Sequence, residues 1–271
     1  MIRWAITAVW RTAGLACALM PLAAMPAAAE ARCGISVERG EAVLLADRIW
    51  ANESGRDPEK ILWWNRGENF ASLGIGHFIW YPAGVEGPFL ESFPPLLSFL
   101  AGAGAPIPAW LGEDPHPDCP WSTREQFMAE RDGAKARELR RLLLESGALQ
   151  AQFMLARLSL ALDAILASVP ASSAGVIEAR FCALAGSPAG RYALLDYVNF
   201  KGEGTKAEER YAGQGWGLAQ ALLGMRGTAP ANVDFAESAA RVLRRRVANA
   251  PPERGEQRWL AGWLRRVESY R

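Results

Sequence analysis

The chain contains only two histidines, His77 and His116, in 271 residues. They are far apart in the sequence and no H-E-x-x-H pattern occurs, so a metal-dependent peptidase would lack an adequate set of zinc ligands. Two histidines also leave few bases that could activate a cysteine nucleophile. We therefore expect neither a metal site nor a catalytic thiol.

Cysteine is also scarce, and its spacing excludes two common site types. Of the four cysteines, Cys17 lies in the N-terminal apolar segment, which leaves Cys33, Cys119 and Cys182. None of them forms a C-x-x-C pair, so neither a thioredoxin-like site nor a zinc finger is indicated. In an oxidising compartment three cysteines allow one disulfide, with three possible pairings and one thiol left over.

The N-terminus has the pattern of an export signal. Arg3 and Arg11 supply positive charge, an apolar run from Thr12 to Ala24 follows, and an A-x-A sequence ends before Glu30. This pattern predicts a secretory signal peptide over residues 1–29 and a secreted or periplasmic protein. The apolar run is too short to span a bilayer comfortably, and we expect no membrane span after signal removal.

The chain also lacks a net charge of either sign. It has 30 Lys and Arg residues against 29 Asp and Glu. Signal removal takes away two arginines and leaves a net charge of about −1. A nearly neutral exported chain has no general attraction for polyanions, so nucleic acid is disfavoured as a partner.

The remaining pattern is mostly helical and predicts one mainly α domain (α+β) over residues 30–271. Residues 82–121 are rich in proline and glycine and predict an irregular surface segment with one short helix. The segment 70–81 alone has strand character, and a capping box at Ser122 and Glu125 predicts a helix start. Further helices are expected at 36–52, 58–65, 96–100, 134–146, 148–169, 172–185, 187–201, 206–225, 232–248 and 253–270.

Glu53 occupies the expected end of the first helix. It follows Ile49 and Trp50 and precedes the helix-breaking Ser54-Gly55. A carboxyl group partly desolvated beside tryptophan has a raised pKa and can act as a general acid. The alternative interpretation is a solvated glutamate at a helix C-terminus.

The segment from Ser72 to Phe78 has the alternating pattern of a β-strand, in which every second residue lies on the same face. If it is extended, Ser72, Gly74 and Gly76 share one face, while His77 lies on the apolar face. Bare backbone at the two glycines would let a polymer approach closely, so both are predicted to bind substrate. His77 is interpreted as a structural histidine with a hydrogen-bonding partner in the core.

A second polar cluster lies on the helix that opens at Ser187. Tyr192, Asp196, Asn199 and Glu203 are spaced by four, three and four residues, which places them on one helical face. Such a face is either simply solvated or part of a cleft wall. On the second interpretation, Asn199 would bind substrate and Glu203 would be a second carboxylate. Tyr197 lies largely on the other side of this helix, and only a faint resemblance to the Tyr-Asn helix in the cleft wall of lytic transglycosylases implies that it also binds substrate.

Aromatic residues and amides near these motifs offer contacts for a sugar. Trp63 and Trp64 are adjacent, and we assign Trp64 to the wall of a binding cleft. The sequence GQGWG at 213–217 contains Gln214, a candidate sugar ligand, and Trp216, which we expect to pack in the core.

Together Glu53 and the sequence SLGIGH (72–77) resemble the phage-type lysozymes. That family has a catalytic glutamate after a helix and then a small β-sheet that ends in threonine or serine followed by xGIGH. The sequence NESG around Glu53 is also similar to the ES signature of goose-type lysozymes and lytic transglycosylases. The resemblance covers about 30 of the 271 residues. It implies a lysozyme-like fold, with a helical domain, a small β-wing and a glycan cleft between them.

The chain departs from the phage-type pattern at the second carboxylate. An aspartate is expected about six residues before the hydroxyl residue, where this chain has Arg66. Glu68 lies two residues later and could substitute for it. The compact Tyr-Asn-Ala-Gly run of lytic transglycosylases is also absent. If there is no second carboxylate, a transglycosylase route is attractive, because the substrate's own acetamido group and 6-hydroxyl then assist one acid.

The resemblance thus implies a secreted peptidoglycan-cleaving glycosidase or lytic transglycosylase that needs no cofactor. Glu53 would be the general acid, Ser72 would position a water or a sugar group, and Glu68 or Glu203 would be the base or electrostatic partner. The alternative is a non-catalytic lysozyme-like protein that binds glycan or supports the cell envelope. The absence of the phage-type aspartate favours this alternative.

Overall fold

The computed structural model describes residues 33–271 except 88, 113 and 115. This part of the chain is mainly helical with two small antiparallel sheets, which confirms the predicted fold class. The predicted signal peptide, residues 1–29, lies outside the described residues.

The helices differ in length from four to 22 residues. They are α2 (Arg39–Ser54), α3 (Phe93–Gly102), α4 (Ala109–Gly112), α5 (Arg124–Glu130), α6 (Ala134–Glu145), α7 (Gly147–Ser168), α8 (Ala171–Ala185), α9 (Pro188–Lys201), α10 (Leu218–Leu223), α11 (Ala231–Asn249) and α12 (Gln257–Glu268). Short 3-10 helices lie at Pro58–Ile61 and Pro252–Arg254. The strands are β1 (Leu62–Trp63), β2 (Ala71–Leu73), β3 (Phe78–Trp80), β4 (Arg210–Tyr211) and β5 (Gln214–Gly215).

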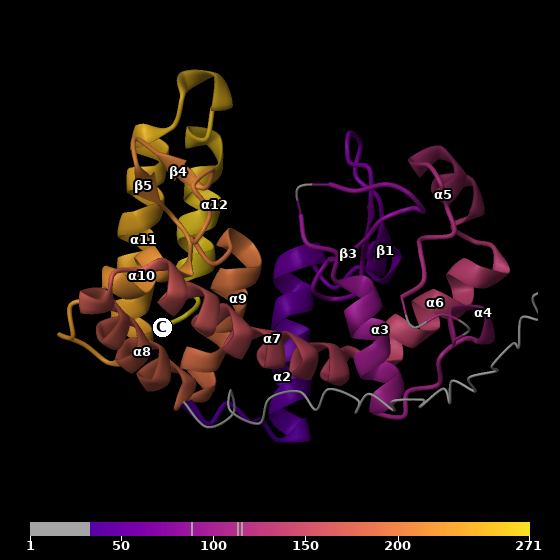
Figure 1. Cartoon of the computed structure of the whole chain (residues 1–271), viewed down its shortest axis with the longest axis horizontal. Helices are drawn as coiled ribbons and strands as arrows, with labels where there is room; N and C mark the ends of the chain where they lie inside the picture. The colour runs from indigo at the N-terminus through magenta and orange to yellow at the C-terminus, as the bar shows by residue number, and fades with distance from the viewer. Residues whose placement is uncertain (1–32, 88, 113, 115) are drawn as a thin grey trace, which may run out of the picture.

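Helix α2 stands between two groups of elements (Figure 1). The strands β1–β3 and helices α3–α6 lie on one side, and helices α8–α12 lie on the other. Helix α7 packs against α2, α3, α8 and α9, so it connects both groups. Among the described helices α7 is long and apolar enough to cross a membrane, but these contacts are those of a core helix.

The first sheet has the order β1-β2-β3 and is antiparallel throughout. Two predictions were wrong here. The predicted helix 58–65 is a 3-10 turn that ends at Ile61 and continues as β1, although Asp57 caps it as expected by accepting from the Glu59 amide at 3.0 Å. The predicted single strand 70–81 is two strands joined by a turn at residues 74–77.

The turn between β2 and β3 is fixed by Gln150, a fully buried residue of α7. Its side-chain carbonyl accepts from the Ile75 amide at 2.9 Å, and its amide nitrogen donates to the Leu143 carbonyl and the Ser146 hydroxyl. Gly74 has φ +72°, and a Cβ atom at this position would collide with the Gln150 side-chain oxygen. A residue with a side chain is therefore excluded by both conformation and space.

Several helix boundaries differ from the predictions by a few residues, for example α2, which was predicted over 36–52 and spans Arg39–Ser54, and two further differences have a clear cause. Helix α5 begins one residue late because Thr123, not Ser122, is its N-cap and accepts from the Gln126 amide at 3.2 Å. The predicted helix 206–225 is a β4–β5 hairpin followed by the short α10. Gly213 has φ +73° in the turn of that hairpin, a conformation that ends a helix.

The three cysteines form one disulfide and leave one thiol, as predicted. Cys33 is bonded to Cys182 of α8, across 149 positions of sequence. Cys119 is buried and free, and burial raises the pKa of its thiol to about 12. It is therefore a neutral thiol at ordinary pH and not an activated nucleophile.

Candidate functional site

The structure brings three polar side chains from distant parts of the chain to the Glu53 carboxylate. Glu53 lies in the last turn of α2, which Gly55 ends in a left-handed conformation. Arg266 of α12 donates to its carboxylate at 2.5 Å and Asn199 of α9 donates at 3.1 Å. His77, from the turn between β2 and β3, lies 3.7 Å away. The Glu53 side chain keeps 15% of its surface exposed, so it remains accessible to a ligand.

The two carboxylate oxygens of Glu53 have different surroundings. Oε1 accepts both hydrogen bonds, from the Arg266 guanidinium and the Asn199 amide. Oε2 faces Nδ1 of His77 at a distance too long for a direct hydrogen bond. Because the two groups at Oε1 are donors, a proton on Glu53 belongs on Oε2. The carboxylate is thus held by one oxygen and free to react at the other.

Arg266 is itself fixed by Asp196, a buried residue of α9. The guanidinium donates to both oxygens of Asp196 at 2.8 Å. Tyr270 donates its hydroxyl to Asp196 at 2.6 Å and Asn52 donates at 2.9 Å. Burial lowers the pKa of Arg266, but Asp196 and Glu53 outweigh it and raise the pKa above its ordinary value. Asp196 is therefore a structural anion that is fully occupied by donors.

The predicted polar face of α9 exists for three of its four members. Tyr192 and Asp196 both accept from Asn52 at the end of α2, and Asn199 donates to Glu53. The first two are buried and not solvated, because this face packs against α2. Glu203 lies beyond the helix end, in the loop that follows α9.

Glu203 is a partly buried carboxyl group. Partial burial raises its pKa, and Arg157 of α7 opposes the shift. Arg157 lies three positions after Met154, whose sulfur is close to Gly76 in the β2–β3 turn. These interactions connect Glu203 with α7, and the position of Glu203 next to Glu53 stays a prediction.

The predicted sugar-binding face of the segment 72–76 is wrong. Ser72 is buried in the central strand, between Trp63 and Ile79. Gly74 and Gly76 are buried too, and the space beside them is filled by the protein's own Gln150 and Met154 side chains. Side chains of α7, and not a ligand, therefore lie against the backbone at these two glycines.

His77 and Tyr197 also differ from their predicted roles. His77 is partly exposed and points toward Glu53, because the turn at φ +52° breaks the alternation that placed it on the apolar face. Tyr197 is fully buried and donates to the Trp216 carbonyl at 2.8 Å, so it cannot contact a substrate. Trp216 is mostly buried, as predicted for a packing residue, and Gln214 is exposed on the β4–β5 hairpin.

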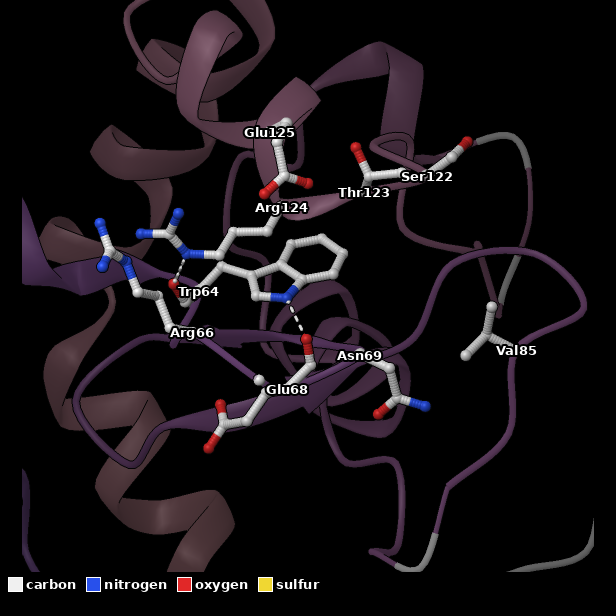
Figure 2. Close-up of a pocket in the computed structure, with 10 residues that line it drawn as sticks. Trp64, Arg66, Glu68, Asn69, Val85, Ser122, Thr123, Arg124 and Glu125 are labelled. Carbon is white, nitrogen blue, oxygen red and sulfur yellow. Dashed lines mark hydrogen bonds between the residues drawn. The ribbon is translucent and has the colours of Figure 1, made fainter.

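Trp64 and Glu68 belong to a separate cavity of about 540 Å³ (Figure 2). The Trp64 indole is 2% exposed and donates to the Glu68 carbonyl at 2.8 Å, while Arg124 donates to the Trp64 carbonyl. The Glu68 carboxylate accepts from Asn65 at 3.0 Å. The cavity is lined by residues of the loop 64–69 and the start of α5, with Val85, and Glu53 is not among them. The structure therefore does not bring Glu68 to Glu53.

Sequence reasoning missed Arg266, Asn52 and Tyr270 and gave Asp196 no role. Arg266 lies in a helix with other arginines, and no local signal distinguishes it from them. Asp196 was visible in the spacing of the α9 face, which was the one available signal.

No group of three or more His, Cys, Asp or Glu side chains within the described ranges is placed to hold a metal ion. Comparisons of the chain with protein-family models, with curated proteins and with solved structures give no match. The interpretation of the site therefore depends on its geometry and chemistry.

Proposed function

We propose that this protein is a lysozyme-like enzyme that cleaves glycosidic bonds of peptidoglycan, with Glu53 as the general acid. The observation that carries the proposal is the asymmetry of the Glu53 carboxylate. Arg266 and Asn199 hold Oε1, and Oε2 is left toward His77 at a partly exposed position. A positioned carboxyl with one reactive oxygen is what protonation of a glycosidic leaving group requires.

His77 is the titratable group that faces the reactive oxygen. Its Nδ1 lies 3.7 Å from Oε2, a gap that closes by a small movement of either side chain. In the hydrolase route, an imidazole there can pass a proton that the attacking water releases to Glu53. In the transglycosylase route, Glu53 takes its proton back from the 6-hydroxyl of the substrate. We therefore include His77 in the proposed site, together with Glu53 and Asn199.

The second carboxylate determines which route the reaction takes. Asp196 is buried and saturated with donors, and Glu68 lies at another cavity, so neither supports the reaction at Glu53. Glu203 is the remaining candidate, as base or electrostatic partner. If Glu203 takes no part in the reaction, the substrate's own acetamido and 6-hydroxyl groups would complete a transglycosylase reaction.

Export to the cell envelope is compatible with the disulfide. The pairing of Cys33 with Cys182 is typical of proteins in oxidising compartments, where peptidoglycan is also found. The predicted signal peptide supports the same location.

The test is digestion of purified sacculi by wild type and by Glu53→Gln, with mass spectrometry of the soluble products. We expect Glu53→Gln to lower the rate by about 10²–10⁴-fold, the usual contribution of general acid catalysis. A matched control is Glu59→Gln, since Glu59 is also paired with an arginine, Arg131, but at the surface. Equal activity of wild type and Glu53→Gln would remove Glu53 from the mechanism.

The products also separate the two routes. Ends with a 1,6-anhydro ring indicate a transglycosylase, and reducing ends indicate a hydrolase. In the hydrolase case Glu203→Gln lowers the rate strongly, whereas a transglycosylase that relies on Glu53 alone retains most of its activity in this variant.

A second candidate function is glycan binding without cleavage. It is favoured by the ion pair of Glu53 with Arg266, which also belongs to the buried network around Asp196. In that case Glu53 is a structural residue, and the protein binds to sacculi without releasing glycan fragments from them. Any glycan release that depends on Glu53 would exclude this alternative.

A further inference from the structure

Lys201, the last residue of α9, lies against two aromatic rings. Its amine nitrogen is 3.8 Å from the centre of the Phe200 ring and 3.5 Å from the centre of the Trp263 ring on α12. The two rings contact each other edge to face, with their centroids 6.3 Å apart. Lys201 is half-buried, so it is largely removed from water but keeps some surface that a small molecule can reach.

The Lys201 amine has no carboxylate partner and no hydrogen-bond acceptor in the part of the chain that the structure describes. An amine that is buried without a counter-charge is more stable in its neutral form. Burial lowers the pKa of Lys201 to about 6, with Arg246 and Arg266 acting in the same direction and Glu256 opposing them. At ordinary pH Lys201 is therefore a neutral amine with a free lone pair, which is the nucleophilic form.

Two guanidinium groups share these rings with the amine. The guanidinium carbon of Arg246 lies 5.0 Å from the centre of the Trp263 ring, and that of Arg266 lies 4.3 Å from the centre of the Phe200 ring. Each group binds its carboxylate partners through Nε and Nη2. Nη1 of both groups makes no hydrogen bond within the described ranges. Both arginines thus keep donors for a further anion.

The surrounding segment is strongly basic, unlike the chain as a whole. Residues 241–271 contain nine arginines and three glutamates, with no lysine or aspartate. Of the glutamates, Glu256 is occupied by Arg246, and Glu268 pairs with Arg271. The excess positive charge favours any reaction that turns a neutral group in this region into an anion.

We infer that Lys201 is a site of reversible carbamate formation with carbon dioxide. The neutral Nζ attacks the carbon of dissolved CO₂, an N–C bond forms, and the electron pair of one C=O π bond moves to oxygen. The nitrogen then gives one proton to water, and the product is a singly negative N-carboxylate. Nothing is oxidised or reduced. The new carboxylate accepts hydrogen bonds from the unused Nη1 donors of Arg246 and Arg266.

Carbon dioxide fits this place better than a larger carbonyl compound that would form an imine. The Phe200 and Trp263 rings cover the amine on two sides, so a small reagent reaches the lone pair most easily. An imine with a sugar aldehyde would be bulkier and uncharged, and it would gain nothing from the two arginines. The inference does not depend on the proposed function, because it requires no glycan and no cleavage.

The test is carbon NMR spectroscopy of the folded protein with isotopically labelled bicarbonate, in equilibrium with CO₂ at about pH 8. Carbamates are also trapped as ethyl esters with triethyloxonium ion and located by mass spectrometry of peptides. Wild type is compared with Lys201→Met, Lys201→Arg and Lys135→Met. Lys135 is the matched control, because its amine lies 5.4 Å from the centre of the Trp110 ring but the residue is exposed.

We expect a carbamate resonance in wild type and in Lys135→Met that is absent in Lys201→Met and Lys201→Arg. The α-amino group also forms a carbamate, so the resonance is assigned from the difference between wild type and the two Lys201 variants. Trapping should find at least about tenfold more carbamate on Lys201 than on any other lysine, since a lysine in water is neutral in less than about 1% of molecules at pH 8. The resonance should weaken as the pH falls through about 6, where Lys201 becomes protonated.

Three results would overturn the inference. The first is a set of carbamate resonances that is the same in wild type and in both Lys201 variants, with thermal unfolding showing that these variants are folded. The second is equal trapping at all four lysines of the chain. The third is protection of wild type from thermal unfolding by bicarbonate and by acetate alike, without a trapped carbamate, because the two arginines would then bind anions non-covalently.

Discussion

Replacing Arg266 by methionine tests the network that holds Glu53. Arg266 donates one hydrogen bond to Glu53 and two to Asp196, and Asp196 is fully buried. Arg266→Met leaves Asp196 as a buried anion without a cation. Removing one partner of a buried ion pair costs about 3–5 kcal/mol, so we expect a loss of this size in the free energy of unfolding.

The double variant isolates the pair from other effects. In Arg266→Met with Asp196→Asn no buried charge remains, while Tyr270 and Asn52 still have an oxygen to donate to. We therefore expect the double variant to be at least about 1 kcal/mol more stable than the sum of the two single losses predicts. Urea unfolding, followed by tryptophan fluorescence and circular dichroism, measures all four proteins.

Two results would refute this reasoning. A loss below about 1 kcal/mol in Arg266→Met would mean that Asp196 is not a buried charge that needs Arg266. Strict additivity in the double variant would mean that the two residues act independently. Arg266→Lys separates charge from geometry, since lysine keeps the charge but cannot bind both oxygens of Asp196 in a planar fork.

Three further predictions concern other parts of the fold. Burial lowers the pKa of Lys201 to about 6 from its ordinary 10.5, so between these values the folded chain binds fewer protons than the unfolded one. The free energy of unfolding of the wild type should therefore rise between pH 6 and pH 9, and that of Lys201→Met should rise less. Urea unfolding at both pH values measures the two increases, and equal increases in the two proteins would contradict the prediction. Gly74→Ala should lower the free energy of unfolding by more than about 2 kcal/mol, because alanine is strained at φ +72° and the space for its Cβ atom is filled by Gln150. Gly84→Ala has φ +70° but open space around it, so it should lower the free energy of unfolding by about 1 kcal/mol. Equal losses in chemical unfolding would show that the space beside Gly74 is not filled. Replacing both Cys33 and Cys182 by serine should destabilise the protein by about 2–5 kcal/mol, and an unchanged melting temperature would count against a structural role for the disulfide.

Local signals in the sequence predicted the parts of the site that are close together in the chain. The position of Glu53 in the last turn of a helix follows from Gly55, which ends α2 two residues after the predicted end at 52. The three-residue and four-residue spacing on α9 placed Asp196 and Asn199 on one face, and both contact the end of α2. These predictions succeeded because helix periodicity and helix termination are local properties.

The errors share a physical cause, which is that a contact with a distant residue decided the structure. A period of two put His77 on the apolar face, but Gln150 binds the Ile75 amide and forces a turn. The glycines of that turn accommodate α7, a helix about 75 positions later, so they gave a false signal for a ligand. Arg266 could not be found, since 213 positions separate it from Glu53.

The separation of Glu53 from Arg266 has a consequence for the order in which the protein is assembled. Chains are synthesised and exported N-terminus first, so another 213 residues must follow Glu53 before its arginine arrives. Asp196 likewise waits 70 residues for the same arginine. Until then both carboxylates lack their cation, and the packing of α2 against α9 is unfavourable. In a protein that has emerged only in part, the proposed catalytic site around Glu53 is therefore incomplete until α12 has been delivered.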